Sequence, residues 1–353
     1  MNRTTLRRCA RALPLYALTV LTPACSGGAA AENPGGVRTQ TLTLGVYTTP
    51  REVYAQLKPL FAQRHLEATG VSVVFQDSYL GSGAQSRAIE GGFEADVAAL
   101  SLEPDIERLV EAGLITHDWK GGVHGGMVSR SIVVLGVRPG NPHGIRDWDD
   151  LARPGVAVLS PNPRTSGGAM WNVAALYGAA LRGRVAGVVA ADTAAADALL
   201  RRVLRNVTVM DKGARESMLT FEAGIGDVII TYENEIIAAQ RAGRDMEYIV
   251  PRSTILIENP AAVVDVYARR HGTETTARAF LEFLTSEPVQ RSFAANGYRP
   301  VLASVEAEFA SSFPAVADVF TIRDLGGWDA VVSAFFGDGG AFDRAGRSPA
   351  ATT

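Results

Sequence analysis

The chain has 353 residues, 47% of them hydrophobic, and a formal net charge of −3 at pH 7. This length and apolar content allow one large or two medium domains with buried cores, and they exclude a chain that is disordered over most of its length. A near-neutral charge without a long basic run also excludes the electrostatic footprint of a nucleic-acid-binding protein.

The N-terminus has the layout of a secretory signal. A cationic stretch, residues 1–11, precedes the apolar segment ALPLYALTVLTPA, which is too short to span a bilayer. We predict that residues 1–24 are a signal peptide that is cleaved. Because this segment carries no acid but several arginines (Arg3, Arg7, Arg8 and Arg11), the remaining chain is more acidic, and any capture of an anion has to be local.

The sequence LTPAC, which ends at Cys25, resembles the lipobox at which bacterial lipoproteins receive a lipid, although Leu21 lies one place early and Pro23 is unusual. Residues 25–40 include SGGAAAENPGG, a composition typical of a flexible tether. We therefore predict a lipid anchor at Cys25 and a location in the periplasm or on the outer face of the envelope. The alternative is free secretion after a cut a few residues later. Since Cys9 leaves with the signal, no cysteine remains for a disulfide or thiolate metal site.

From Gln40 onward, short β-like runs alternate with helical patterns, which is typical of a mostly parallel sheet covered by helices. The expected strands are TLTLGVY, VSVVFQ, ADVAAL, GVAVLS, NVTVM and GDVIITY. The expected helices are at residues 51–68, kinked at Pro59, and at 82–91, 103–112, 168–181, 194–205, 215–223, 233–242, 273–284 and 288–296. The alanine-rich segment 184–202 reads as a surface helix, and residues 344–353 as a disordered tail.

Two longer β-like runs, residues 129–140 and 253–268, are long enough to pass between lobes. We predict an α/β fold of two lobes with a ligand cleft between them. In this division a discontinuous lobe 1 consists of residues 41–129 and 257–343, and lobe 2 consists of residues 130–256.

Three segments share a turn of small residues that leads into a helix. They are LGSGAQSRA with Ser82 and Gly83, PRTSGGAMWN with Ser166–Gly168, and DKGARESML with Gly213 and Ala214. The first turn of a helix leaves its N–H groups without intrahelical partners, and the helix dipole is positive there, so such turns bind anions. Ser82 and Ser166 also carry hydroxyls. Because a single turn of this kind is more often a simple cap, the prediction of an anion site requires the three turns to meet.

Long segments between about Leu42 and Asp343 resemble the periplasmic sulfate and thiosulfate-binding proteins of ABC importers. These segments are GSGAQSRAIEGGFEADVAAL, GNPHGIRDWDDLARPGVAVLSPNPRTSGGAMWN, DKGARESMLTFEAGIGDVIITYENE, FLTSEPVQRSFAANGYRP and FTIRDLGGWDAVVSAFFGDGGAFD. The resemblance implies a two-lobed type II periplasmic-binding-protein fold that closes on dehydrated sulfate or thiosulfate held by uncharged donors. It also implies delivery to an ABC permease with a cytoplasmic ATPase, no cofactor and no enzyme activity.

Carried over by motif, the resemblance implies ligand contacts, mostly through backbone N–H groups, at Thr48, Ser82, Ser166, Gly167, Gly168, Ala214 and Tyr232. Two of these positions depart from the family. Thr48 in TTPRE stands where the family has aspartate, which a backbone N–H donor tolerates. Tyr232 in IITYENE replaces a tryptophan, whose N–H only donates, whereas a phenol donates or accepts. An acceptor would tolerate a protonated oxyanion, so a strict preference for sulfate does not follow. The alternative keeps the fold and changes the ligand to molybdate, tungstate, phosphate or an organic sulfonate.

An enzyme is the rival class of protein. No GxSxG elbow occurs, and no metal-ligand spacing is found among the histidines, which are His65, His117, His124, His143 and His271. Glu233 and Glu235 form a pair of acids that we interpret as a solvated helix start. GSGAQS resembles a dinucleotide fingerprint with Ser86 in place of the third glycine, but export argues against a nicotinamide cofactor. Arg164 and Arg215, which flank two of the turns, are interpreted as exposed surface residues.

Overall fold

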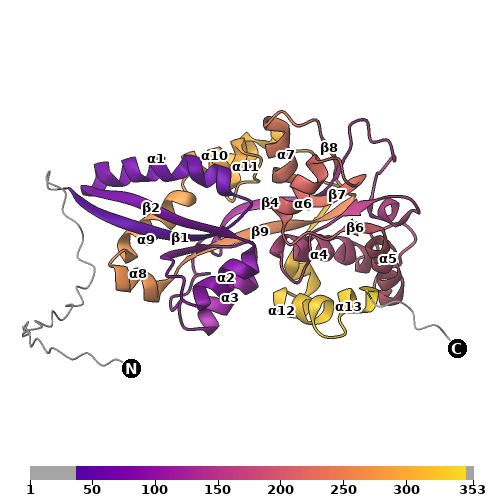
Figure 1. Ribbon diagram of the computed structural model, residues 1–353, viewed down its shortest axis with the longest axis horizontal. Coiled ribbons are helices and arrows are strands. Elements are labelled where there is room, and N and C mark those ends of the chain that lie inside the picture. The colour runs from indigo at the N-terminus through magenta and orange to yellow at the C-terminus, as the bar shows by residue number, and fades with distance from the viewer. Residues whose placement is uncertain (1–36, 347–353) are drawn as a thin grey trace, which may run out of the picture.

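The structure is a computed structural model that describes residues 37–346 (Figure 1). The predicted signal peptide, Cys25, most of the tether and residues 347–353 of the predicted tail lie outside this range. Two boundaries are corrected within it, because Arg38–Gln40 already belong to the first strand and Arg344–Gly346 belong to the last helix. No helix within residues 37–346 is both long and apolar enough to cross a membrane.

The first lobe is a twisted sheet with helices on both faces (Figure 1). Its strands are β1 (Arg38–Tyr47), β2 (Val71–Leu80) and β3 (Val97–Ala99). Its helices are α1 (Arg51–Thr69), α2 (Ser82–Glu90), α3 (Glu103–Glu111), α8 (Asp265–His271), α9 (Glu274–Leu284), α10 (Glu287–Ala295) and α11 (Ala303–Glu308). Helix α1 continues through Pro59 to Thr69.

The second lobe repeats this layered arrangement. Its strands are β5 (Val158–Leu159), β6 (Val207–Val209), β7 (Val228–Tyr232), β8 (Glu247–Ile249) and β10 (Asp318–Phe320). Its helices are α4 (Gly167–Leu181), α5 (Thr193–Asn206), α6 (Ala214–Glu222), α7 (Glu233–Arg241), α12 (Trp328–Val331) and α13 (Ala341–Gly346), with 3-10 turns at Trp148–Ala152 and Ile322–Leu325 and a π-helix at Val332–Phe336. A further 3-10 turn, Ala310–Ser312, follows α11 and contacts it. The alanine-rich segment is helical only from Thr193, and this helix buries Leu199 and Leu200 instead of lying wholly on the surface.

Two long strands join the lobes, as the two long runs in the sequence predict. β4 (Met127–Val137) and β9 (Ser253–Val263) pair antiparallel with each other, and the spatial order of the sheet is β2-β1-β3-β9-β4-β7-β5-β6. β1 pairs parallel with β2 and β3, and β5 pairs parallel with β6 and β7. The two-lobed α/β fold expected from the sequence is therefore confirmed.

The alternation of side chains along each strand explains why both faces carry helices. Val133 and Leu135 of β4 belong to the hydrophobic core that the sheet forms with α4 and α5. Ile132 and Val134 belong to a second core, which the sheet forms with α6 and α7. Successive side chains of a strand point to opposite faces, so a strand with apolar residues at consecutive positions is buried on both sides.

The C-terminal segment lies in the second lobe, which corrects the predicted division of the chain. We expected residues 257–343 to lie wholly in lobe 1. Instead, β10 pairs with the beginning of β9, and Trp328 packs edge-on against Trp171 of α4 with ring centroids 4.7 Å apart. Phe335 contacts Tyr177 in the same way. The chain therefore passes between the lobes a third time, because these aromatic side chains belong to the hydrophobic core of the second lobe.

Candidate functional site

A cavity between the lobes is built from turns at the ends of strands. Within each lobe the carboxyl ends of the parallel strands face the other lobe, so the loops that follow these strands meet in the cleft. The lining residues are Tyr47, Thr48, Thr49, Gly81, Ser82, Ser101, Ser166, Gly167, Gly168, Gly213, Ala214 and Tyr232. The structure thus brings together all seven residues that we assigned to the ligand from the sequence.

Three helices begin at this cavity, and their first turns supply unpaired backbone N–H groups. Helix α2 begins at Ser82, α4 at Gly167 and α6 at Ala214. Residues in the first turn of a helix have no intrahelical acceptor for their N–H groups, and each N-terminus carries roughly half a positive charge. The three predicted turns therefore converge with their electropositive ends on one small volume.

The two serines at these helix starts use their hydroxyls differently. Ser166 is the N-cap of α4, and its Oγ accepts from Ala169 N–H at 3.3 Å, so its hydroxyl hydrogen is free to point into the cavity. Ser82 Oγ donates to Asp105 Oδ2 at 2.5 Å and accepts from Ser101 N–H at 2.9 Å. Its hydrogen is already used, so Ser82 offers the cavity its backbone N–H alone.

The glycine pair at the start of α4 allows close approach on two sides. A Cβ on Gly167 would lie 3.0 Å from Leu102 Cγ and 3.2 Å from Ser101 Oγ, both in the first lobe. A Cβ on Gly168 would lie 3.2 Å from Ala214 Cβ, inside the second lobe. Gly167 is therefore needed for contact between the lobes, and Gly168 for packing of the cavity wall.

Direct hydrogen bonds connect the lobes around the cavity. Trp171 Nε1 of α4 donates to Ser101 O at 3.0 Å, and Ser101 Oγ lies 2.8 Å from Tyr232 Oη. Gly81 lies against the backbone of Thr165, where a Cβ would be 3.1 Å from the carbonyl oxygen. This geometry is that of a closed cleft.

Every residue that lines the cavity is uncharged at neutral pH, and Arg215, which follows a lining residue in the sequence, is already paired. Arg215, directly after Ala214, donates to Glu52 Oε2 of lobe 1 at 2.7 Å and lies 3.9 Å from Glu235 Oε2. Our interpretation of Arg215 as an exposed surface residue is wrong, since it lies half-buried between these two carboxylates. Its charge is therefore offset locally.

The paired acids at the start of α7 are also not solvated, which corrects the sequence interpretation. Glu233 and Glu235 are 0% and 3% exposed, and burial raises the pKa of each. Arg299 opposes this shift at Glu233 through two hydrogen bonds, at 2.7 and 3.0 Å. The acids serve as buried ion-pair partners because the end of β7 carries them into the interior.

Arg164, in the turn before α4, contacts Asp343 in the C-terminal helix and remains half-exposed, in agreement with its expected surface position.

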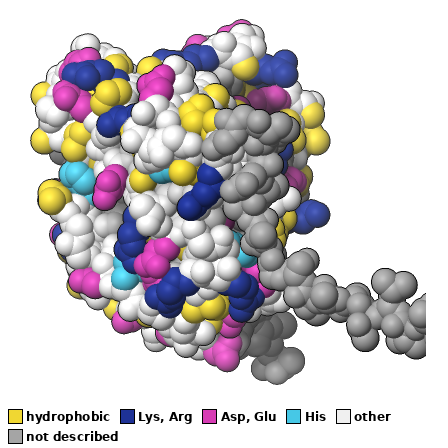
Figure 2. All heavy atoms as spheres, turned by 90° about the vertical axis from the view of Figure 1, so that its left-hand side faces the viewer, with side chains coloured by type: hydrophobic (Ala, Val, Ile, Leu, Met, Phe, Trp, Pro, Cys, Tyr) yellow, Lys and Arg dark blue, Asp and Glu magenta, His cyan; other side chains and the backbone are white. Residues whose placement is uncertain are grey.

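Figure 2 shows the outer end of the first lobe, where Lys and Arg side chains are interspersed with Asp and Glu side chains. A broad positive field does not cover this face.

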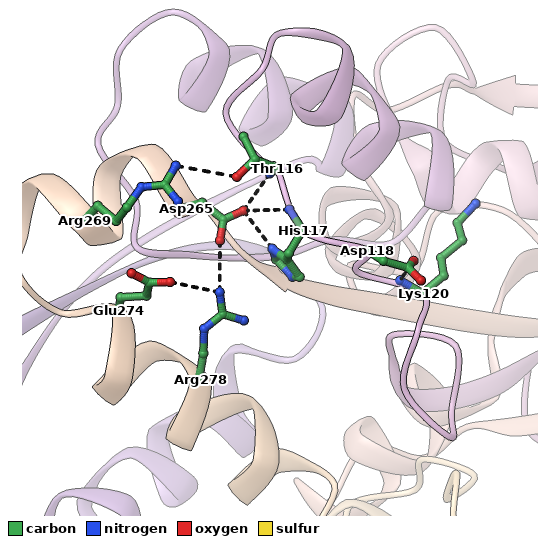
Figure 3. Close-up of polar contacts among 8 residues, drawn as sticks. All are labelled: Thr116, His117, Asp118, Lys120, Asp265, Arg269, Glu274 and Arg278. Atoms are coloured by element: carbon green, nitrogen blue, oxygen red, sulfur yellow. Dashed lines mark hydrogen bonds and ion pairs between the residues drawn. The ribbon is translucent and has the colours of Figure 1, made fainter.

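The histidines provide no second site. His117 Nδ1 lies 2.7 Å from Asp265 Oδ2, which also accepts from Thr116 N–H at 2.6 Å (Figure 3). The other oxygen of Asp265 accepts from Arg278 at 3.3 Å, so this cluster ties the loop after α3 to α8 and α9. None of the residues drawn in Figure 3 lines the cavity. Among residues 37–346, no three His, Cys, Asp or Glu side chains are grouped to hold a metal ion.

The sequence prediction omitted some lining residues, of which Ser101 is the most informative. It lies two residues after the end of β3, as Ser82 lies two residues after the end of β2, and α3 begins two residues later. That position in the segment ADVAALSLEP was a usable signal. The others are Tyr47, Thr49, Gly81 and Gly213, each adjacent in sequence to a predicted residue.

Comparison with known proteins agrees with the geometry. The sulfate-binding protein of Synechococcus elongatus is 40% identical over 333 residues, which cover 94% of this chain and 93% of that protein. The thiosulfate-binding protein of Escherichia coli is 33% identical, covering 88% of this chain and 92% of that protein. Both relatives are named as binding proteins, not as enzymes.

Among solved structures, the sulfate-binding protein SubI from Mycobacterium tuberculosis superimposes with a TM-score of 0.77 at 38% identity, over 84% of this chain and 99% of that chain. A periplasmic thiamin binding protein, with a TM-score of 0.65 at 14% identity, shares the fold alone. Residues 42–299 match the family described as bacterial extracellular solute-binding protein. The chain belongs to this family and, within it, to the same group as its sulfate- and thiosulfate-binding relatives.

Proposed function

We propose that this chain captures sulfate or thiosulfate outside the cytoplasm and delivers it to an ABC importer. The observation that carries the proposal is the interlobe cavity with its uncharged lining, onto which three helix N-termini converge. The relatives named above, at up to 40% identity over nearly the whole chain, support the choice of ligand.

The donor set suits a tetrahedral dianion without a proton. The backbone N–H groups of Ser82, Gly167, Gly168 and Ala214, together with the Ser166 hydroxyl, donate hydrogen bonds. Three helix N-termini add about +1.5 charges in total, which is comparable to the charge of the ligand. Hydrogen bonds to a charged partner contribute a net of about 1.5–3 kcal/mol each, a value that already includes the loss of the bonds to water, so several converging donors favour the bound anion.

Binding is coupled to closure of the lobes. A ligand shifts the equilibrium toward the closed form only if it contacts both lobes there. Thr48 and Ser82 come from lobe 1, whereas Ser166, Ala214 and Tyr232 come from lobe 2. The closed form then presents surfaces of both lobes to the permease and its cytoplasmic ATPase, while a lipid on Cys25 holds the protein at the membrane.

Isothermal titration calorimetry of the purified chain tests the ligand. We expect binding of sulfate or thiosulfate and no response to NAD. Binding of molybdate, tungstate or an organic sulfonate with no response to either sulfur oxyanion would refute the proposal. X-ray scattering should give a smaller radius of gyration with ligand than without it, and identical profiles would argue against closure.

A second experiment tests anchoring and delivery in cells. Cys25→Ser should release the protein from the membrane fraction and abolish labelling by a lipid precursor. Uptake of labelled sulfate should fall when the gene is deleted and return with the wild-type copy. Unchanged uptake in the deletion strain would contradict a role in import.

A further inference from the structure

Two hydroxyl groups face each other across the cleft at the wall of the cavity. Ser101 follows β3 in the first lobe and Tyr232 ends β7 in the second, and each is 1% exposed. Their oxygens lie 2.8 Å apart, with either atom able to donate, and both residues line the cavity. The pair therefore combines a contact between the lobes with a polar surface that a ligand touches.

The surroundings fix the position of Ser101 and leave its hydroxyl for this pair. Its backbone N–H donates to Ser82 Oγ, and its carbonyl accepts from Trp171 Nε1 and from Asn259 Nδ2 at 3.2 Å. Because these bonds use the backbone groups of Ser101, its side-chain oxygen is held rigidly against the phenol of Tyr232. Burial raises the pKa of Tyr232, so the phenol keeps its proton at neutral pH.

The number of hydrogens determines what this pair offers a ligand. Two hydroxyls carry two hydrogens, and one hydrogen is used between them. With sulfate, the second hydrogen is donated to a ligand oxygen. With a ligand that carries one proton, Tyr232 donates to Ser101 and accepts from the ligand O–H, while Ser101 donates to another ligand oxygen. An indole N–H at position 232 would not accept at all.

We propose that the Ser101–Tyr232 hydroxyl pair is a specificity element that lets the cavity hold a monoprotonated tetrahedral oxyanion as well as sulfate. Hydrogen phosphate is the simplest such ligand. The inference rests on the proposed function, because it assigns a second ligand class to the same cavity. It identifies Ser101 as a residue that sets specificity through its bond to Tyr232.

Calorimetric titration with sulfate and with inorganic phosphate, above the second pKa of phosphate, tests the pair. The wild-type chain should bind both anions. Ser101→Ala removes the acceptor for the Tyr232 hydrogen, and Tyr232→Trp removes the acceptor for the ligand proton. Each variant should weaken phosphate binding at least about tenfold more than it weakens sulfate binding, as expected for an unpaired buried polar group that only the protonated ligand leaves behind. Ser253→Ala is the matched control, because Ser253 is buried and donates to Asp318 outside the cavity.

The outcomes separate this inference from the function on which it rests. Sulfate binding without any phosphate binding by the wild-type chain would overturn the inference and leave the proposed function intact. Binding of neither sulfate, thiosulfate nor phosphate would overturn both. Equal losses for the two anions in Ser101→Ala, at an unchanged melting temperature, would show that the pair merely seals the cleft. Should Tyr232→Trp fail to fold, the ratio of affinities in Ser101→Ala decides alone.

Discussion

The two walls of the cavity are built on the same strand-to-helix turn but present different groups. The wall from the second lobe exposes nearly bare backbone at Gly167, Gly168 and Ala214, and a serine hydroxyl with a free hydrogen at Ser166. The wall from the first lobe holds its Ser82 hydroxyl in an internal network with Asp105 and Ser101. A Ser-Gly turn before a helix can therefore serve the ligand in one lobe and the architecture of the wall in the other.

The largest effect is expected where the second wall touches the first. Gly167→Val places a branched side chain against Leu102 and Ser101, so the cleft cannot close around the anion. We expect affinity for sulfate to fall by at least about a hundredfold, which corresponds to overpacking of about 1–3 kcal/mol plus one lost hydrogen bond to the anion. Titration calorimetry measures the affinity, and scattering should show an open form with sulfate present.

The control for this variant is Gly122→Val, a position where a Cβ meets no atom within 4 Å. Normal sulfate binding by Gly167→Val would mean that the turn is merely structural. A large drop in melting temperature without ligand would instead place the clash within a lobe.

The two serines should separate binding from stability. Ser166→Ala removes a hydroxyl donor to the anion, so affinity should fall roughly tenfold to a hundredfold, with about 1 kcal/mol lost from the helix cap. Ser82→Ala leaves the buried Asp105 carboxylate without this partner. That variant should lose about 1–3 kcal/mol of unfolding free energy with a smaller change in affinity.

Urea denaturation and calorimetry on both serine variants check this contrast. Asp192→Ala provides a cap control, because Asp192 caps α5 through a bond to Ala195 N–H at 2.9 Å and has no role in the cavity. If Ser82→Ala reduces affinity more than Ser166→Ala does, the assignment of the two walls is reversed.

A smaller effect is expected at the ion pair that bridges the walls. Glu52→Gln removes the partner of Arg215 in the opposite lobe, and the Glu52 side chain is 59% exposed. Exposed ion pairs contribute about 0.2–1 kcal/mol, so sulfate affinity should fall by less than about fivefold, and less still at high salt. Glu67→Gln, an exposed acid on the same helix, should leave the affinity unchanged. An equal loss of sulfate affinity in both variants would mean that the loss does not come from the ion pair between Glu52 and Arg215.

The smallest effect is expected from Asp105, whose buried carboxyl group bonds to Ser82 behind the first wall of the cavity. Burial raises the pKa of Asp105, against the lowering effect of the hydrogen bond from Ser82. Protonation is therefore more favourable in the folded than in the unfolded state, so the stability that Asp105 provides at low pH is lost as pH rises from about 3.9 through the raised pKa. Asp105→Asn should become more stable relative to wild type across that window and then keep a constant advantage. Unfolding free energies measured in a pH series would contradict this if the difference stayed flat.

The sequence was sufficient for features that depend on neighbours along the chain. The turns at Ser82, Ser166 and Ala214 were predictable because a small or hydroxyl residue, a glycine and the start of an apolar helical pattern are local signals. Their meeting in one cavity followed from the resemblance to a family, since no local pattern states which strand ends are adjacent.

Features that depend on distant partners were not predictable. Glu233 reads as a solvated first-turn acid until Arg299, 66 residues away, is brought against it. The C-terminal helices carry no signal that identifies their lobe, because the aromatic cluster of Trp328 with Trp171 forms only in the folded chain. The same holds for Ser82, whose partner Asp105 lies in the following helix.

The third passage of the chain between the lobes has a mechanical consequence. The backbone crosses at β4, at β9 and again before β10, and we expect three crossings to restrict twisting of one lobe about the other more than bending. The described ends of the chain lie on opposite halves, with β1 on one side and α13 on the other (Figure 1). Opening of the cleft between the lobes therefore displaces these two ends relative to each other. A pair of fluorophores attached there would report each cycle of ligand binding and release.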